Sequence, residues 1–243
     1  MIGVGVVAGT RRRSVAASAP FAGIGSLFAG GQKGAYYDFA DRTKLAVNDD
    51  GSGGSPSVGG AARWAVDQSP NGNHLRNTTG SSVAVASNGI ATSGAGLGLY
   101  NAPGHGGWPQ VDPPFVLVAT FEQLAYAGDD RRIVDMSATF LLQGPTDGTV
   151  RTHSTASYGV EVNARIGEEV TVEAVFNGSA SSIALDGGPP TTFNLPVQAG
   201  YQMLLGSDAG GNNAASVRFK RLFIREGVLS ATDRAGVIAW ARA

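Results

Sequence analysis

Glu169 and Glu173 are the first pair of acidic side chains whose spacing could support chemistry. They lie four residues apart in a stretch that alternates apolar and polar residues. In a strand both carboxylates share one face, and four residues at ~3.3 Å each separate them by roughly 13 Å. Glycoside hydrolysis needs two carboxyl groups about 5–5.5 Å apart for retention or about 6.5–9.5 Å apart for inversion. This pair fits neither geometry.

The short motifs of other common chemistries are also missing from the sequence. It contains no Gly-x-Ser-x-Gly elbow, no P-loop and no His-Glu-x-x-His motif, and its three histidines lie in separate segments. With no cysteine, it has no thiolate nucleophile, no disulfide and no thiolate metal site. We therefore predict no catalytic residue and no cofactor, and we expect that the protein is not an enzyme.

Two polar loops offer oxygen atoms of the kind that bind calcium. Asp129 and Asp130 are adjacent in one loop, and Asp208 precedes Asn212 and Asn213 in another. Calcium takes six to eight oxygen ligands, which neither loop supplies by itself. Adjacent acidic residues in loops are more often only solvated. We therefore predict no metal site.

The loop that follows residue 100 carries residues suited to sugar recognition. It is too rich in glycine and proline for regular structure, and loops on a rigid scaffold often carry binding residues. Aromatic rings can stack on the apolar face of a sugar, while amides pair with its hydroxyl groups. The alternative is that Trp108 only anchors the loop to the core and binds no sugar. The candidate carbohydrate-binding residues are Tyr100, Asn101, His105, Trp108 and Gln110.

Composition points to one all-β domain. The 243 residues are 42% hydrophobic, which is enough for the core of one large domain. The 36 glycines and 11 prolines, with only 15% charged residues, indicate many turns between short strands. A formal net charge of -1 gives no attraction for a polyanion, so we expect no nucleic-acid partner. No apolar run reaches the length of a transmembrane helix, so we expect no membrane partner.

The first 25 residues are predicted to form a docking arm ahead of a domain that spans residues 26–243. Residues 1–8 are apolar and three arginines follow at 11–13, which reverses the order of a secretory signal. No signal peptide is therefore expected. An apolar, arginine-bearing terminal segment is more typical of a docking arm than of a folded unit. The alternative is a disordered tail.

The most strongly patterned stretch, residues 170–188, predicts a β-hairpin. Val170, Val172 and Ala174 alternate with polar neighbours and form one apolar row. Asn177 and Gly178 supply residues that tolerate the positive φ of a tight turn. The alternation resumes beyond the turn, as a return strand requires.

The other predicted elements complete a sandwich with one helix. Residues 115–121 are apolar on both faces and predict a central strand. In the last strand the apolar parity slips between Lys220 and Arg221, which predicts a β-bulge. Ser230 starts a short C-terminal helix, with Asp233 completing a capping box. Further strands are predicted at residues 82–87, 89–92, 97–100, 133–142, 158–162, 201–206 and 217–225.

Two segments resemble the entry segment of tail and capsid-surface proteins of bacterial viruses. They are GAYYDFAD at residues 34–41 and WAVDQSPNGNH at residues 64–74. Tyr36 stands where that pattern has a tryptophan, and Pro70 where it has a glycine, which a tight turn also accepts. Polar side chains in such loops commonly bond to their own backbone. We therefore interpret four residues of the second segment as structural: Asp67, Ser69, Asn71 and His74.

The predicted hairpin and the closing segment RLFIREGVLSATDR, residues 221–234, resemble laminin-G-like and concanavalin A-like jelly rolls. This resemblance implies an all-β, two-sheet antiparallel sandwich with an N-terminal arm and one short C-terminal helix. Glucanases that share the jelly roll carry a Glu-x-Asp-x-x-Glu strand, which is missing from this sequence.

Together the resemblances imply a non-catalytic protein on a virion surface that binds polysaccharide of the host-cell surface. They imply a spike or fibre, made in the host cytoplasm, that assembles as a homotrimer and contacts other virion proteins through its arm. The alternative is a purely architectural virion protein whose jelly roll serves assembly only.

Overall fold

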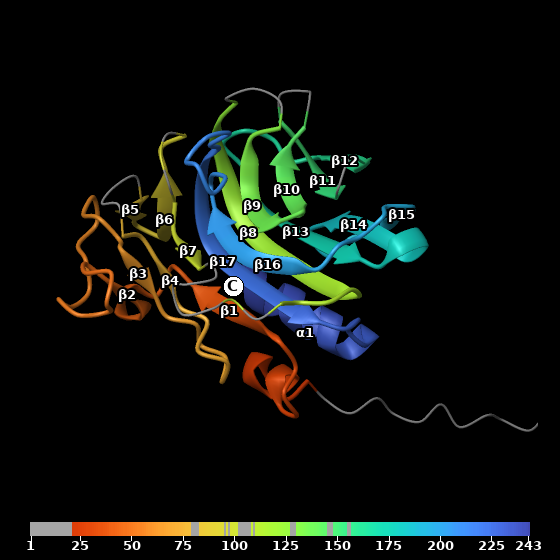
Figure 1. Cartoon of the computed structure of the whole chain (residues 1–243), viewed down its shortest axis with the longest axis horizontal. Helices are drawn as coiled ribbons and strands as arrows, with labels where there is room; N and C mark the ends of the chain where they lie inside the picture. Colours follow the sequence, from red (N-terminus) through yellow and green to blue (C-terminus); the bar gives the residue numbers. More distant parts are fainter. Residues whose placement is uncertain are drawn as a thin grey trace, which may run out of the picture.

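Two antiparallel β-sheets and one C-terminal helix make up this protein in a computed structural model (Figure 1). The structure describes residues 21–78, 83–94, 96, 98–101, 108, 110–126, 130–144, 148–154 and 157–243. One apolar core lies between the sheets. The predicted all-β sandwich with a short C-terminal helix is therefore confirmed.

The first sheet, called sheet A, is built around the longest strands. In spatial order it contains β15 (Thr191–Phe193), β14 (Ser181–Leu185), β13 (Glu169–Phe176), β8 (Phe115–Ala125), β17 (Ser216–Glu226), β6 (Gly89–Thr92) and β5 (Val83–Ala86), and β1 (Gly34–Asp38) also pairs with β17.

The second sheet, called sheet B, is wider and ends in very short strands. In spatial order it contains β12 (Ser157–Asn163), β11 (Thr149–Ser154), β10 (Thr139–Gln143), β9 (Arg132–Ser137), β16 (Gly200–Leu205), β7 (Tyr100–Asn101), β4 (Leu75–Arg76), β3 (Trp64–Ala65) and β2 (Leu45–Ala46). The described ranges also contain three 3-10 turns: η1 (Ile24–Phe28), η2 (Arg42–Lys44) and η3 (Gly178–Ala180).

Strand β8 is buried on both faces, as its continuous apolar sequence predicts. Phe115 and Leu117 point into the core between the sheets. Val116 and Val118 point the other way and pack beneath η1 and the C-terminal helix. In Figure 1, β8 and β17 run side by side through the middle of the molecule. A strand that is buried on both faces has a nearly continuous apolar sequence instead of alternating apolar and polar residues.

Helix α1 (Ala231–Arg242) covers the outer face of sheet A. The Ser230 hydroxyl accepts a hydrogen bond from the Asp233 backbone N–H at 3.1 Å, so the predicted N-cap is confirmed. The Asp233 carboxylate accepts from the Ser230 hydroxyl at 2.7 Å, where a capping box would use the Ser230 backbone N–H. At the other end, the hydroxyl of the buried Thr120 donates to the Ala241 carbonyl at 2.9 Å. Among the described residues, no helix is long and apolar enough to span a membrane.

The predicted β-hairpin is confirmed, although its turn differs from the expectation. Strands β13 and β14 pair antiparallel, with Val172 opposite Leu185. Asn177 has φ −148°, and the connection forms the single 3-10 turn η3 instead of a two-residue turn. The predicted bulge in β17 is also confirmed, because the pairing with β8 shifts between Phe219 and Arg221.

One predicted strand is wrong. Residues 133–142 form two strands, β9 and β10, which pair antiparallel. Ser137 adopts φ 80° at the reversal. Serine rarely takes this conformation, and the turn contains no glycine or asparagine. The sequence therefore gives no signal of a reversal here.

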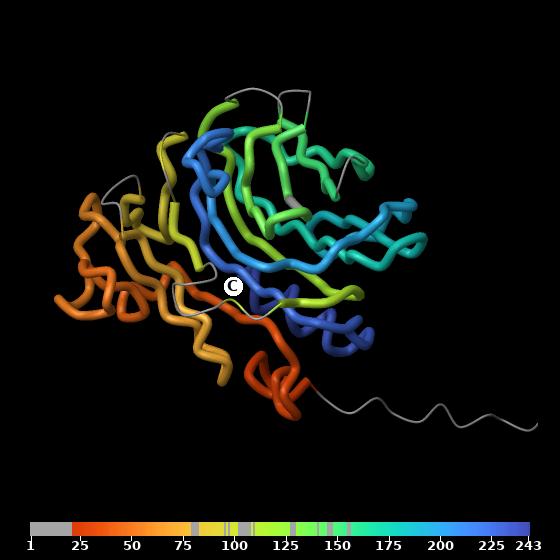
Figure 2. Tube along the Cα trace, viewed as in Figure 1, coloured from red at the N-terminus to blue at the C-terminus, as the bar shows by residue number. Residues whose placement is uncertain are grey.

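The predicted docking arm lies mainly outside the described residues, which begin at Phe21. From there the chain packs against α1: an added Cβ on Gly236 would contact the Phe21 ring. The 3-10 turn η1 follows directly and belongs to the same apolar cluster. In Figure 2 this red segment lies beside the blue C-terminal helix. The homotrimer and the contacts of the arm with other virion proteins stay predictions.

Asp67 organises the polar segment that connects β3 to β4. Its carboxylate accepts hydrogen bonds from the backbone N–H groups of Tyr36, Ser69 and Asn73 and from the Ser69 hydroxyl, at 2.7–3.2 Å. Burial raises the pKa of Asp67, although these bonds oppose the shift. His74 Nδ1 accepts from the Asp67 N–H at 3.0 Å. The structural interpretation of this segment is confirmed.

Replacing Asp67 with asparagine should destabilise the fold by about 1–3 kcal/mol, because an amide N–H₂ would face donors that now meet a carboxylate oxygen. Urea denaturation of the parent and Asp67→Asn measures the change. Asp50→Asn is the control: exposed Asp50 accepts one bond from the Ser52 N–H, and its replacement should cost less than about 0.5 kcal/mol. Equal midpoints for Asp67→Asn and the parent would contradict the organising role.

Candidate functional site

A row of mainly polar and aromatic side chains crosses the outer face of sheet B, which is turned away from the core between the sheets. Val134, Met203 and Leu75 take inward positions on β9, β16 and β4, so the next residue along each strand points outward. The strand registers place these outward residues opposite one another. The row includes Tyr158, His153, Asp135, Leu204, Tyr100, Arg76 and Trp64.

A pocket of about 270 Å³ opens at the β12 end of this row. Strands β9 to β12 form this end of the sheet, and β2 to β4 lie at the opposite end (Figure 1). Leu142 supplies an apolar patch, and the other lining residues are polar or aromatic. The pocket is lined by Asp130, Arg132, Leu142, His153, Tyr158 and Asn213.

Tyr158 provides an aromatic surface that is held in place by two partners. Its hydroxyl donates to Asp130 Oδ2 at 2.7 Å. The Arg151 guanidinium carbon lies 3.8 Å from the ring centroid, and Arg151 Nη2 also donates to Asp130 Oδ1 at 2.8 Å. The tyrosine is nevertheless 47% exposed. Arg151 lies over the ring, and the His153 ring centroid lies 4.7 Å from that of Tyr158, so a ligand would stack on the part of the ring that these two side chains leave exposed.

The opposite wall is positioned by ionic and backbone contacts. Arg132 Nη1 donates to the buried Asp135 carboxylate at 2.7 Å. The Arg132 backbone N–H donates to the Asn213 carbonyl at 2.7 Å. The Asn213 amide in turn donates to Asp208 Oδ2 at 3.0 Å. These bonds fix Arg132 and Asn213 before any ligand arrives.

Two of the groups that line the pocket, Asp130 and His153, have shifted pKa values. Burial by itself raises the pKa of Asp130, but hydrogen bonds from Tyr158 and Arg151 outweigh it and lower the pKa below its ordinary value. Burial lowers the pKa of His153, and Arg132 and Arg151 add to that shift against the attraction of Asp130. At neutral pH Asp130 therefore accepts hydrogen bonds as a carboxylate, while His153 is an uncharged imidazole.

The lowered pKa of His153 predicts a titration midpoint below the ordinary value of 6.5. The unfolded chain then binds the His153 proton more tightly than the folded chain, so this group costs stability as the pH falls through about 6.5. An NMR titration of the ring protons, assigned with His153→Gln, measures the midpoint. Urea midpoints at pH 7.5 and 5.5 provide the second measurement: the decrease at low pH should be smaller in His153→Gln. A midpoint above 6.5 would contradict the role of burial.

The residues predicted to bind sugar in the loop after residue 100 are mostly buried where the structure describes them. Trp108 is only 4% exposed and belongs to the core between the sheets. Tyr100 and Asn101 are also buried. Gln110 is exposed but donates to Asp112 Oδ1, and His105 lies outside the described residues. The aromatic platform expected at Trp108 is therefore covered in this structure. A binding role of the loop stays a prediction.

The two loops considered for calcium meet at the pocket. Asp130 and Asn213 both line it, and Asp208 holds Asn213. However, both Asp130 oxygens accept hydrogen bonds, and Asp208 Oδ1 accepts from the backbone N–H groups of Gly210 and Asn212. In the described part of the chain, no three His, Asp or Glu residues gather as a metal site would require. These carboxylates organise the protein's own groups.

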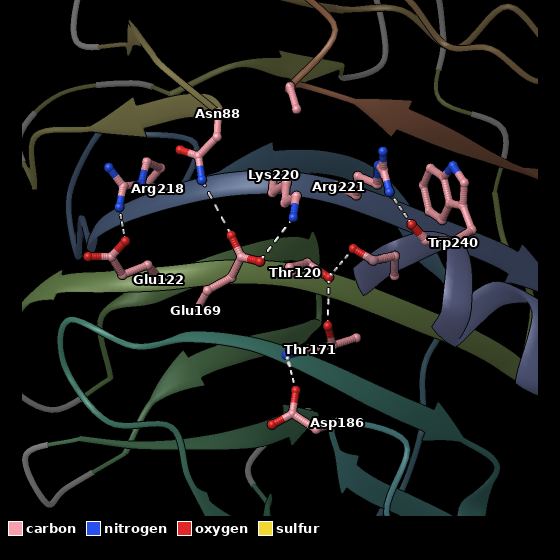
Figure 3. A network of polar contacts seen from close by, with 12 residues as sticks. Asn88, Thr120, Glu122, Glu169, Thr171, Asp186, Arg218, Lys220, Arg221 and Trp240 are labelled. Carbon is pink, nitrogen blue, oxygen red and sulfur yellow. Dashed lines mark hydrogen bonds and ion pairs between the residues drawn. The ribbon is translucent and has the colours of Figure 1, made fainter. Parts of the chain in front are cut away.

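A second set of charges lies on the outer face of sheet A. Glu122 and Glu169 are directly opposite each other across β8 and β13. The sequence alone pairs Glu169 with Glu173 and misses this neighbour. Arg218 forms an ion pair with Glu122, and Lys220 Nζ lies 3.1 Å from Glu169 (Figure 3). Two opposed carboxylates repel each other, so the neighbouring cations stabilise this part of the sheet.

The pocket residues themselves were missed by sequence reasoning, with the exception of Asp130 and Asn213. Arg132, His153 and Tyr158 come from three strands, and only the register of β9 to β12 brings them together. One local signal was available: residues 158–162, which include Tyr158, were predicted as a strand from their weak alternation of apolar and polar residues. No spacing rule connects it to Asp130.

Comparisons with known proteins identify the fold. No family model matches the chain, and no curated protein matches its sequence. Among solved structures, a Trypanosoma rangeli sialidase in complex with sialic acid is similar over 82% of this chain, with a TM-score of 0.53 and 13% identity. A GH54 α-L-arabinofuranosidase soaked with a cyclic sulfate inhibitor is similar over 89% of this chain, with a TM-score of 0.53 and 16% identity. The chain spans 36% of the sialidase and 64% of the arabinofuranosidase.

These similarities contradict two expectations. The protein was expected to be a non-catalytic or purely architectural virion protein, and it was expected not to be an enzyme. Its similar structures instead bear the names of enzymes that act on carbohydrates, and neither name refers to a virion. At such low identity the likeness shows the fold alone. The Glu-x-Asp-x-x-Glu motif belongs to the glucanases that share the jelly roll, so its absence here does not exclude catalysis of another kind.

Proposed function

We propose that this protein binds carbohydrate in the pocket on the outer face of sheet B. The observation that carries the proposal is the exposed Tyr158 ring beside the fixed polar groups of Asp130, Arg132 and Asn213. Sugars need this combination, because each ring has apolar C–H faces and a rim of hydroxyl groups.

Each pocket group has a role that suits a sugar. The exposed part of the Tyr158 ring stacks on the C–H face of the sugar. The Asp130 carboxylate accepts hydrogen bonds from hydroxyl groups, while Arg132 and the Asn213 amide donate to them. Leu142 excludes water at the apolar part of the pocket. Since all these groups are positioned by internal contacts, little side-chain entropy is lost on binding.

The comparisons support the proposal at the level of fold. A β-sandwich similar to this one occurs in structures named for a sialidase and an arabinofuranosidase. Fold does not fix function, so the proposal rests on the pocket.

Replacing Tyr158 with alanine should weaken sugar binding at least tenfold, a loss of about 1.4 kcal/mol, because the stacking surface is removed. The measurement is isothermal titration with methyl glycosides of arabinose, xylose, glucose and galactose, preceded by a wider glycan array. The same samples, assayed for released sugar, determine whether a bound glycoside is cleaved.

Tyr201→Ala is the matched control. Tyr201 is 44% exposed on β16 and does not line the pocket. Its replacement should leave the affinity within about twofold, since exposed contacts away from the ligand contribute little. Equal losses in both variants, or no binding of any glycan by the parent, would overturn the proposal.

A further inference from the structure

The charged groups of the proposed sugar pocket are already matched with one another. Asp130 lies 2.8 Å from Arg151 Nη2, and Arg132 Nη1 lies 2.7 Å from Asp135. Glu161 also faces Arg151, at 3.9 Å. Each cation at this site therefore has a carboxylate partner. The imidazole of His153, which also lines the pocket, is uncharged at neutral pH because burial lowers its pKa.

An anionic ligand meets no uncompensated cation here unless one of these pairs breaks. The charge of Arg132 is already offset by Asp135, whose side chain is 2% exposed, so a ligand carboxylate would gain the full attraction of Arg132 only if Arg132 left this partner. Removing one partner of a buried ion pair is strongly destabilising, because the other charge stays buried without compensation. Asp130 lies on the wall itself and repels a second carboxylate. Both effects disfavour acidic sugars.

The size of the pocket sets a second limit. Its volume of about 270 Å³ lies just below the range of ≈ 300–1,000 Å³ common for small-molecule sites. One pentose or hexose ring fits this space, whereas a nine-carbon acidic sugar with its side chain needs more. Hydroxyl groups can use the donors and acceptors of the wall without displacing an ion pair.

From these contacts, and given the proposed function, we infer that the pocket selects an uncharged pentose or hexose unit and rejects uronic and sialic acids. The selecting residue is Asp130, which offers its carboxylate to hydroxyl groups and repels ligand carboxylates. Arg132 donates to the sugar while it stays paired with Asp135.

The test compares methyl glycosides that differ mainly in charge. Methyl glucoside with methyl glucuronide, and methyl galactoside with methyl galacturonide, are titrated into the full chain. The neutral member of the better-binding pair should bind at least tenfold more tightly, because like charges at a binding site cost several kcal/mol. Methyl sialoside should not bind. The affinity for the neutral sugar should change less than about twofold between 0.05 and 0.5 M NaCl, since salt screens charge interactions alone.

Asp130→Asn isolates the cause of the selection. It removes the repelling charge and leaves the Arg151 guanidinium with less compensation, so the preference for the neutral sugar should narrow at least threefold. Asp50→Asn makes the same chemical change in an exposed, distant loop and should leave the preference unchanged. If Asp130→Asn does not fold, the comparison of neutral and acidic glycosides on the parent chain still tests the selection.

The outcomes separate the two proposals. If no sugar of either charge binds, carbohydrate binding itself is overturned. If an acidic sugar binds more tightly than its neutral partner, or if affinity falls steeply with salt, the sugar site stands and the selection of neutral sugars is overturned. An unchanged preference in a folded Asp130→Asn variant overturns the role of Asp130.

Discussion

The burial of strand β8 on both faces is the constraint on which the rest of the structure depends. Its inner side chains need sheet B as a cover, and its outer valines need η1 and α1. Exposing either apolar row would cost on the order of 25 cal/mol for each Å² left in water. The helix therefore occupies the outer face of sheet A, where Thr120 anchors its last turn. The outer face of sheet B is then the place where the sandwich carries its polar pocket.

The pocket shows how a rigid scaffold can orient polar groups without a long loop. Tyr158, His153 and Arg132 project from adjacent or nearby strands, whose spacing the ladder hydrogen bonds fix. Asp130 and Asn213 enter from the ends of strands and are tied to this frame by Arg151 and by the Arg132 backbone. The pair of Arg151 with the partly exposed Asp130 thus contributes orientation more than stability, since partly exposed pairs are worth roughly 0–1 kcal/mol each.

Local patterns predicted those parts of the fold that local forces determine. The two-faced β8, the hairpin of β13 and β14, the bulge at Lys220 and the cap at Ser230 all follow from neighbouring residues. The β9–β10 reversal could not be predicted, because Ser137 adopts a positive φ that serine rarely takes, and no glycine or asparagine marks the turn. The pocket was missed for a related reason: it depends on the pairing of four strands, and pairing between distant residues leaves no spacing signal. Trp108 failed as a platform because a ring in a loop packs into a core as readily as it faces water.

Acidic side chains on the outer faces of the two sheets have different surroundings. On sheet A, Glu122 and Glu169 each face a cation of β17 across a regular ladder. On sheet B, the environments of two aspartates push their pKa values apart: hydrogen bonds lower the pKa of Asp130 against the effect of burial, while burial raises that of Asp135 against Arg132. Asp135 is held by Arg132 and does not line the pocket, whereas Asp130 lines it directly. Asp130 is therefore the carboxylate that meets a ligand on sheet B, and Asp135 acts by positioning Arg132.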